Sequence, residues 1–512
     1  MRKKLSPAQE RARAYHIKRW IRVLKTTVLL ITVIGVVFTV LGIIGNKTYP
    51  NIVLVTVDSF RPDHLSLYGY QQNTTPNLEK IARDGIVFKR FYTTVPRSAG
   101  AAVSLFSGRY PQNTGFRVTM ASLAKTEKTL AKYLKIYEYQ TAAFSGNPVV
   151  SQSRGIGKGF DSFLSVPRPI IAERLTGRLL DWLKKHQTRH FFAWIHYHDP
   201  SRPYLRFPFT KTPERGRQRN LSLFHFNQDG MITSDKIFDR AYSPDQQTAT
   251  IDRYDEDIHA VDTQLGKINA FLRNNNLTKN TILVIAGLHG ENLGDHYRHF
   301  GHGEFLYNTT IKVPLVIRYP RKLPDPVTIG EVTRIIDVAP TILSLAEVKY
   351  KSELMDGENL YPFLKDDNKV LKLKAFVESG ETFFPDYKQY RKRSRVAGYS
   401  RAIIDKDKKL IMTPGPQTDQ YEFYDLGKDL YEKRNRIHNS NYSREITELK
   451  AELAKWMRLD YEKDKTESLV EKRLKLYSLG YLQALNSKKP NKFIKMIQED
   501  MEKRKRKKKK KK

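Results

Sequence analysis

The stretch TILVIAGLHGENLGDHYRHFGHGEFLYNTTIKVPLVIRYP, residues 281–320, carries most of the information about this chain. It opens with a short apolar run rich in β-branched residues, which predicts a buried strand of a parallel sheet. Glycine, histidine and acidic residues follow this run directly. Because ligands of open α/β sheets bind beyond the carboxyl ends of the strands, a functional site is expected just after residue 286.

Two other runs read as strands, NIVLVTV at residues 51–57 and HFFAWIHY at residues 190–197. Between the second of them and residue 281, the segment DEDIHAVDTQLGKINAFLRN places five apolar residues at helical spacing. This spacing predicts a helix that covers one face of the sheet. The alternation of strands and helices predicts an α/β protein, a three-layer α/β/α sandwich.

The chain has 512 residues and 40% hydrophobic content, which is enough for a large domain and a smaller one. We place the large domain at residues 50–350. After this the pattern changes to shorter pieces: RAIIDKDKKLIMTP predicts a hairpin and SREITELKAELAKWM an amphipathic helix. Residues 351–490 are therefore expected to form an α+β subdomain. The polar, basic segment 201–247 is expected to be a surface insertion.

Residues 26–44, TTVLLITVIGVVFTVLGII, form an uncharged apolar run about as long as a membrane-crossing helix. Residues 1–25 are strongly basic, so the positive-inside rule predicts a cytoplasmic amino terminus and an exported large domain. A cleaved signal peptide is the competing interpretation, but no small-residue cleavage site follows the run. We therefore predict a single-pass membrane protein.

The charge and composition of the chain limit the classes of partner that it can bind. Lys and Arg total 90 against 54 Asp and Glu, a net charge of +36, which favours anionic surroundings such as sulfated glycans or phospholipid headgroups. A basic tail is expected at residues 491–512, where the last ten residues are all Lys or Arg. Export of the domain makes nucleic acid an improbable partner. The chain has no cysteine, so it can form neither disulfides nor thiolate metal sites.

Asp58 directly follows the 51–57 run, where a carboxylate could hold a hard divalent cation or simply cap a helix. Its surroundings, VDSFRPDHLSLYGY and then TTPNLEKIARDGIVFKRFYTTVPRSAGAAVSLFSGRYPQNTG, resemble the amino-terminal half of the sulfatase family within the alkaline phosphatase superfamily. The resemblance continues through HGENLGDHYRHFGHGEFLYNTTIKVPLVI to about residue 435. It implies an alkaline phosphatase-like sandwich, a carboxyl-terminal subdomain with a small antiparallel sheet, and a single-metal site for sulfate or phosphate esters.

Counted back from SGRYP, Ser98 stands where the family has its nucleophile. A residue that opens a helix lies among unpaired N–H groups that stabilise an anion, although Ser98 could also merely cap the helix. Maturing sulfatases carry Pro two residues after the nucleophile and Arg four after it; this chain has Gly100 and Ala102. Formylglycine is therefore not expected. Arg97 is the candidate cation for binding the ester.

The resemblance also implies a metal site at Asp58 and His289, for Ca2+ or Mg2+/Mn2+. The Asp that precedes the family's histidine is Leu288 here, and Asp58 is followed by Ser59 rather than a second Asp. Replacement ligands would have to come from water or from the nearby carboxylates, which are Asp63, Glu291 and Asp295.

Five further histidines belong to the candidate site. His302 stands where relatives contact the ester's oxygens, and we assign it as a leaving-group acid. The spacing of His296, His299 and His302 also permits a zinc site, but Gly301 interrupts any regular geometry. His196 resembles a substrate-binding histidine. His198 resembles another that could supply the leaving-group proton, or it is a structural histidine.

Two functions follow. The first is a membrane-anchored hydrolase of sulfate or phosphate esters that uses a serine nucleophile and a divalent metal. The second is an inactive sulfatase-like protein that keeps the anion-binding pocket and binds anionic glycans or lipids. Leu288, Gly100 and Ala102 motivate the second function. Turnover that depends on Ser98 would distinguish the two.

Overall fold

A computed structural model describes residues 7–43, 49–117, 121–124, 126–167, 169–201, 244–296, 300–303, 305–323, 326–366, 369–379, 399–413 and 419–461. The chain divides into two compact units, Met1–Tyr49 and Pro50–Lys512. Most of the 201–247 insertion, all of the 491–512 tail and His299 lie outside the described residues.

The first unit consists of one helix, α1, Pro7–Ile43. It joins the basic segment and most of the apolar run into one continuous element. Within the described residues, however, no helix combines the length and the apolar character that a membrane crossing requires. The membrane-spanning assignment of residues 26–44 therefore stays a prediction.

The second unit is built on an eight-stranded sheet in the order β10-β2-β9-β6-β1-β5-β3-β4. The strands are β1 Asn51–Val57, β2 Ile86–Tyr92, β3 Gln140–Ser145, β4 Ser162–Leu164, β5 Phe191–Tyr197, β6 Thr281–Gly287, β9 Lys312–Arg318 and β10 Val327–Arg334. The three predicted runs form the centre: Val57 pairs with Tyr197 on one side and with Gly287 on the other. The residues that follow these three strands therefore emerge together at one edge.

The sheet differs from the expected parallel sheet at one strand. β9 runs antiparallel to both of its neighbours, β2 and β6, whereas β1, β3, β4, β5 and β6 are parallel. A parallel neighbour needs a crossover connection, usually a helix. The chain between β6 and β9 has only the short elements β7 Asn292–Leu293, β8 Phe300–Gly301 and α9 Asn308–Ile311, so β9 returns in the opposite direction.

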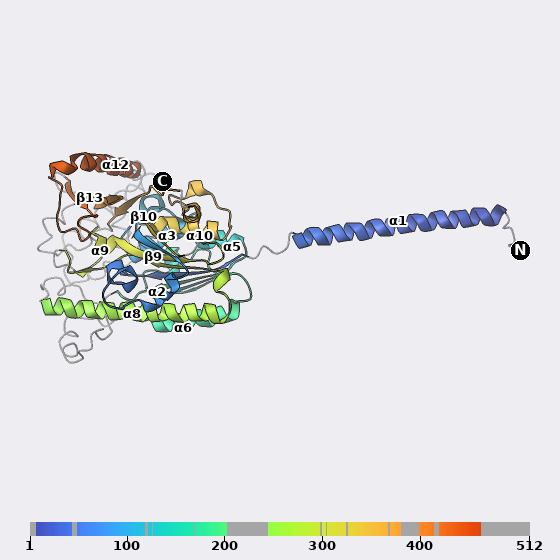
Figure 1. The fold of residues 1–512 in the computed structure, drawn as a ribbon, viewed down its shortest axis with the longest axis horizontal. Helices are drawn as coiled ribbons and strands as arrows, with labels where there is room; N and C mark the ends of the chain where they lie inside the picture. Colours follow the sequence, from blue (N-terminus) through green and yellow to red (C-terminus); the bar gives the residue numbers. More distant parts are fainter. Residues whose placement is uncertain are drawn as a thin grey trace, which may run out of the picture. The chain divides into compact units, whose positions relative to one another are not determined.

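Helices cover both faces of the sheet, which confirms the layered α/β architecture (Figure 1). One face carries α2 Pro76–Ala82, α6 Ala172–His186 and α8 Pro244–Asn274, and their apolar side chains join those of β1, β5 and β6 in a single core. α8 contains the helix predicted for residues 255–274. The other face carries α3 Ser98–Ser107, α5 Leu130–Ile136 and α10 Val338–Leu345. Two short helices also belong to this unit, α4 Pro111–Thr114 and α11 Tyr361–Lys365.

The expected small antiparallel sheet is present. It has the order β11-β12-β13-β14, with β11 Lys374–Glu378, β12 Arg401–Asp405, β13 Lys408–Thr413 and β14 Gln420–Asp425. β12 and β13 are the predicted hairpin, and α12, Ser443–Tyr461, is the predicted helix. A buried ion pair anchors this sheet: Lys409 Nζ lies 2.5 Å from Glu432 Oε1, and Glu432 Oε2 accepts the Asn308 N–H at 2.6 Å. The subdomain is thereby tied to the segment between β6 and β9.

Candidate active site

Asp58 is the centre of the site. It directly follows β1 and is completely buried. Its Oδ2 lies 3.2 Å from His196 Nε2 and 3.5 Å from His198 Nδ1, and its Oδ1 lies 3.2 Å from His289 Nε2. Burial by itself would raise the pKa of Asp58, but the neighbouring imidazoles, His196 foremost, hold it well below its usual value. Asp58 is therefore a carboxylate at neutral pH.

His196 is held beneath Asp58. Thr56 Oγ1 accepts the Trp194 indole N–H at 2.9 Å and lies 3.0 Å from His196 Nδ1. Because Nε2 faces the Asp58 carboxylate, the imidazole proton lies on Nε2, and Nδ1 accepts the threonine hydroxyl proton. His196 is fully buried. This position does not suit the substrate-binding role expected from the sequence, because no ester could reach a ring enclosed beneath Asp58; His196 instead orients that carboxylate.

Ser98 begins α3 and is 7% exposed. Its Oγ lies 3.1 Å from His289 Nε2 and 3.2 Å from Asn147 Nδ2. The Asn147 amide is oriented by the Val149 N–H, which donates to Asn147 Oδ1 at 2.9 Å. Because Nδ2 can only donate, Ser98 Oγ accepts there, and its own proton is directed to His289.

His289 is set to receive that proton. Its Nδ1 lies 2.9 Å from the Gly290 carbonyl oxygen and must donate to it, so Nε2 carries the lone pair in the neutral ring. Burial lowers the pKa of His289, but Asp58 Oδ1 lies 3.2 Å from Nε2 and accepts a hydrogen bond from that nitrogen once it is protonated, so Asp58 outweighs burial and raises the pKa above its usual value. Asp58 therefore makes His289 a stronger base and stabilises the imidazolium.

His302 lies over His289, with ring centroids 4.0 Å apart. Its Nδ1 is 2.9 Å from Glu291 Oε2, which also accepts the Ser59 hydroxyl at 2.6 Å. Burial, together with the charge of His289, lowers the pKa of His302 to about 4. The ring is thus neutral at neutral pH and directs its bare Nε2 away from Glu291. The sequence suggested His302 as the acid that protonates the leaving group. In the neutral ring, the only ring proton is donated to Glu291, so His302 has no proton to supply.

Arg97 stands at the N-cap position of α3 and is partly exposed. A Cβ built on Gly303 would come within 2.7 Å of Arg97 Cζ, so the guanidinium lies against the backbone beside His302. Gly303 has φ of +104°, a conformation that glycine adopts without strain. The guanidinium and the amino end of α3 together place positive charge next to Ser98.

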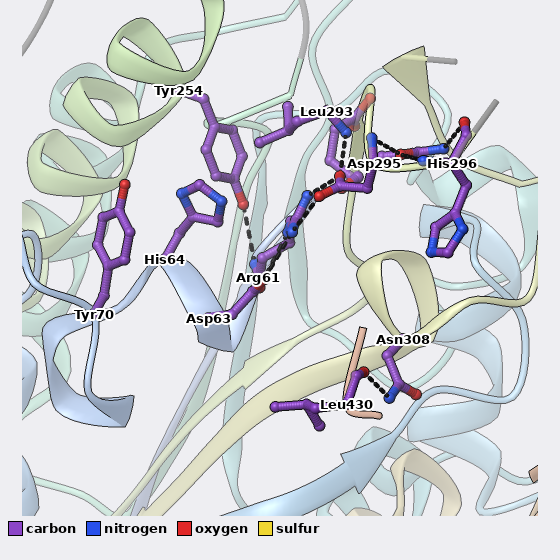
Figure 2. Close-up of polar contacts among 12 residues, drawn as sticks. Arg61, Asp63, His64, Tyr70, Tyr254, Leu293, Asp295, His296, Asn308 and Leu430 are labelled. Carbon is purple, nitrogen blue, oxygen red and sulfur yellow. Dashed lines mark hydrogen bonds and ion pairs between the residues drawn. The ribbon is translucent and has the colours of Figure 1, made fainter. Parts of the chain in front are cut away.

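Each of the three carboxylates considered as replacement metal ligands has other partners: Glu291 Oε2 bonds Ser59 and His302, and the other two pair with an arginine. Arg61, completely buried, lies 2.7 Å from Asp63 and 2.7 Å from Asp295, and donates to the Glu291 carbonyl oxygen at 3.0 Å. Figure 2 shows both carboxylates directed at this guanidinium. The charge of Arg61 outweighs burial and lowers the pKa of both acids. Asp63 and Asp295 are thus unavailable to a cation beside Asp58.

Tyr254 of α8 fixes the loop that follows β1. Its hydroxyl accepts the Arg61 backbone N–H at 3.1 Å (Figure 2). The same hydroxyl donates to the Ser59 carbonyl oxygen at 2.6 Å. Ser59 has a φ of +51°, which is uncommon for a residue other than glycine. The helix on one face of the sheet therefore holds the strained turn that positions Asp58.

The remaining donors do not fit a resident hard divalent cation. Asp58 Oδ1, His289 Nε2 and Ser98 Oγ converge, but only one of them is a carboxylate oxygen, whereas Ca2+ and Mg2+ take six or more ligands, mostly oxygens. Leu288 is buried at 0% exposure, and its backbone N–H bonds the Val57 carbonyl oxygen at 2.9 Å. In the part of the chain that the structure describes, no group of three or more His, Asp or Glu side chains could hold a metal ion.

The structure brings Asp58, Ser98, His198, His289 and His302 together. It sets His296 apart, because that ring stacks on Tyr307 with centroids 3.8 Å apart.

Sequence reasoning missed the roles of Asn147 and Glu291. Asn147 lies two residues beyond β3 and donates to both Asp58 Oδ2, at 2.7 Å, and Ser98 Oγ. Its position after a strand, in the motif TAAFSGNPVVS, was the available signal. Glu291 holds Ser59 and His302, and nothing in its local sequence predicts that pairing.

Comparisons with known proteins agree with this architecture. The family model described as Sulfatase matches residues 50–348, more than half of the chain, and that described as N-sulphoglucosamine sulphohydrolase, C-terminal, matches residues 295–458. An N-acetylglucosamine-6-O-sulfatase of Bacteroides thetaiotaomicron is 23% identical, over 78% of this chain and 85% of the relative. An arylsulfatase of Clostridium perfringens is also 23% identical, over 79% and 94%.

Solved structures share the fold. A protein in complex with its substrate D-glucosamine-2-N,6-O-disulfate aligns with a TM-score of 0.65 at 20% identity, covering 82% of this chain and all of that one. A phosphonate monoester hydrolase of Agrobacterium radiobacter gives a TM-score of 0.65 at 21% identity, with 80% and 96% covered. The chain belongs to the sulfatase family of the alkaline phosphatase superfamily.

Proposed function

We propose that this chain hydrolyses sulfate or phosphate esters with Ser98 as the nucleophile and His289 as its base. One observation carries the proposal: Ser98 Oγ lies 3.1 Å from a His289 nitrogen whose lone pair faces it, because the other ring nitrogen donates to a carbonyl. A buried hydroxyl within hydrogen-bond reach of an oriented base is the arrangement that activates a nucleophile. A serine that merely capped α3 would not need this partner.

In the first step Ser98 Oγ forms a bond to the sulfur or phosphorus while the bond to the ester's leaving oxygen breaks. The hydroxyl proton passes to His289, whose imidazolium Asp58 stabilises. His198 donates a proton to the leaving oxygen; it is 20% exposed at its side chain and reaches solvent where His196 does not. The amino end of α3 and Arg97 stabilise the ester's nonbridging oxygens.

In the second step water attacks the esterified Ser98. His198 accepts a proton from that water, and His289 returns its proton to Ser98 Oγ as the bond to sulfur or phosphorus breaks. Sulfate or phosphate leaves, and both histidines return to their starting states. His302 holds the anionic group through its bare nitrogen once that nitrogen gains a proton, which an adjacent anion favours. No step passes through the divalent cation expected from the family.

The substrate we propose is a sulfated glycan, since relatives carry the names N-acetylglucosamine-6-O-sulfatase and Ulvan-active sulfatase. We also propose that residues 26–44 anchor the chain in a membrane, with the amino terminus cytoplasmic and the large domain outside. The uncharged apolar run, the basic residues before it and the continuity of α1 support the anchor.

An inactive protein that binds anionic glycans or lipids is the second candidate. Leu288 favours it, because a buried leucine stands where the family has a ligand carboxylate. Asn147, His289 and Ser98 nevertheless form a connected hydrogen-bond chain that anion binding alone does not need. We therefore place hydrolysis first.

The test is turnover of an aryl sulfate, a phosphate monoester, a phosphate diester and a phosphonate monoester by the purified full-length chain. Ser98→Ala is expected to lower kcat roughly 10³-fold or more on whichever ester is cleaved. Ser107→Ala is the matched control in the same helix, because the Ser107 hydroxyl bonds the Val103 carbonyl instead of the site. Absence of turnover on all four esters, or equal losses in the two variants, would refute the proposal.

A further inference from the structure

A second polar cavity lies at the opposite end of the central strands from the candidate active site. Its volume is about 760 Å³, and its lining comes from α2 and the residues after it, α8, the turn that precedes β6, the end of β9 and the loop after β9. Volumes of roughly 300–1,000 Å³ are typical of small-molecule sites. Lys279 of its rim precedes β6 while His289 follows it, so seven strand residues at about 3.3 Å each separate the two sites by roughly 23 Å.

Arg318 forms the floor of this cavity. The residue is 1% exposed, and its Nη1 donates to Asn269 Oδ1 at 2.7 Å. Its Nε and Nη2 have no hydrogen-bond partner among the residues that the structure describes. Buried guanidinium groups are normally paired, since an unsatisfied charged donor costs more than a neutral one. These two N–H groups lie on the same side of the planar guanidinium, so they can donate together to two oxygens of a sulfate or phosphate group.

The walls of the cavity add to this positive charge. Lys80, Arg273 and Lys279 line it from exposed positions, and Asp84 is the one carboxylate in the lining. Burial lowers the pKa of Arg318, the charge of Asp84 acts against this, and the charge of Arg273 adds to it. One carboxylate among these basic side chains leaves the cavity lining with an excess of positive charge. Thr278 Oγ1 also lines the cavity and, within the described part of the chain, has no hydrogen-bond partner.

We propose that this cavity is a second anion site that binds a sulfate or phosphate group through the Arg318 fork. Four cationic side chains surround the group, and Thr278 supplies a hydroxyl donor. The cavity is larger than one oxyanion, so the group is carried on a small molecule or on one residue of a glycan. The site does not depend on the proposed hydrolysis, because it shares no residue with the Ser98 cluster.

The test is calorimetric titration of the full-length protein with sodium phosphate, sodium sulfate and a sulfated hexasaccharide at constant ionic strength. Arg318→Gln is expected to weaken one binding event roughly 10-fold or more, the effect of removing charge-assisted hydrogen bonds. Arg321→Gln is the matched control, because Arg321 is outside the cavity and bonds Asn280. Ser98→Ala should retain the event, which separates it from anion binding at the active site.

Binding of the inorganic ions would identify a free oxyanion as a sufficient ligand, and binding of only the hexasaccharide would identify a glycan-borne group. Equal titrations for Arg318→Gln and Arg321→Gln would overturn the site. If Arg318→Gln does not fold, the double variant Arg273→Ala/Lys279→Ala tests the rim. It should weaken binding roughly 3- to 10-fold in a salt-dependent way, and unchanged binding would equally reject the proposal.

Discussion

Replacing Leu288 with aspartate tests whether the family's metal site has been lost here. Leu288 is fully buried, so Leu288→Asp forfeits about 2–3 kcal/mol of apolar burial. It also places a carboxylate in the loop that holds Asp58, and an unpaired buried charge costs several kcal/mol more. Without a cation, we expect a total loss of about 4 kcal/mol or more, a large share of a typical unfolding free energy.

A divalent cation should restore part of the lost unfolding free energy in Leu288→Asp, and it should not do so in the wild type. A cation present at 100 times its dissociation constant contributes about 2.7 kcal/mol to the folded state. The wild-type chain, with one carboxylate at the site, should gain less than about 0.5 kcal/mol under the same conditions. Leu288→Asn is the matched control, because it has the same shape but adds no charge; it should be destabilised and gain nothing from the cation.

The assay is urea unfolding followed by circular dichroism, in EDTA and then in millimolar Ca2+ or Mg2+, beside elemental analysis of each protein. Stoichiometric metal in the wild type, or wild-type stability that falls in EDTA, would show that another ligand replaces the lost carboxylate. The assignment of the site as unfit for a hard cation would then be wrong.

Three further predictions follow from the same contacts. The reaction needs neutral His289, whose pKa is raised by Asp58, so the pH–rate profile should fall on the acid side through a pKa above 6.5; an acid limb below 6.5 would contradict the assignment of the base. Burial lowers the pKa of His296 from 6.5 to about 4. Between these pH values the unfolded state binds more protons than the folded state, so the free energy of unfolding should fall by up to about 3 kcal/mol as the pH drops from about 6.5 to 4. Denaturation of His296→Phe, which keeps the stacking on Tyr307, should lack most of this dependence, and an unchanged dependence would assign it to other groups. Lys409→Met should cost about 3–5 kcal/mol in urea unfolding by leaving Glu432 buried without its cation, and Lys409→Met/Glu432→Gln should recover part of this; equal losses would show that the charge is not the cause.

The sequence by itself determined the three central strands of the large sheet and the covering helix. Residues 51–57 and 281–287 are short, mainly apolar runs without a charged residue, a pattern typical of central strands covered on both faces. Ser98 and His289 could be placed at the site because each stands at a position of the sulfatase motifs that this sequence resembles. The hairpin at residues 401–413 was equally local, since its turn and strand pattern lie within one short segment.

Tertiary structure alone decided which of the polar residues serve the site. Arg61 takes its neighbour Asp63 away from any metal, and it also takes Asp295, which is 234 residues away along the chain and which no local pattern connects to it. Asn147 reaches Asp58 because β3 lies two strands from β1 in the sheet. Arg318 becomes an anion-binding candidate only because β9 runs antiparallel and ends at the opposite edge. Local sequence sets which segments become strands, whereas strand order and direction depend on packing between distant segments, and these determine which charges meet.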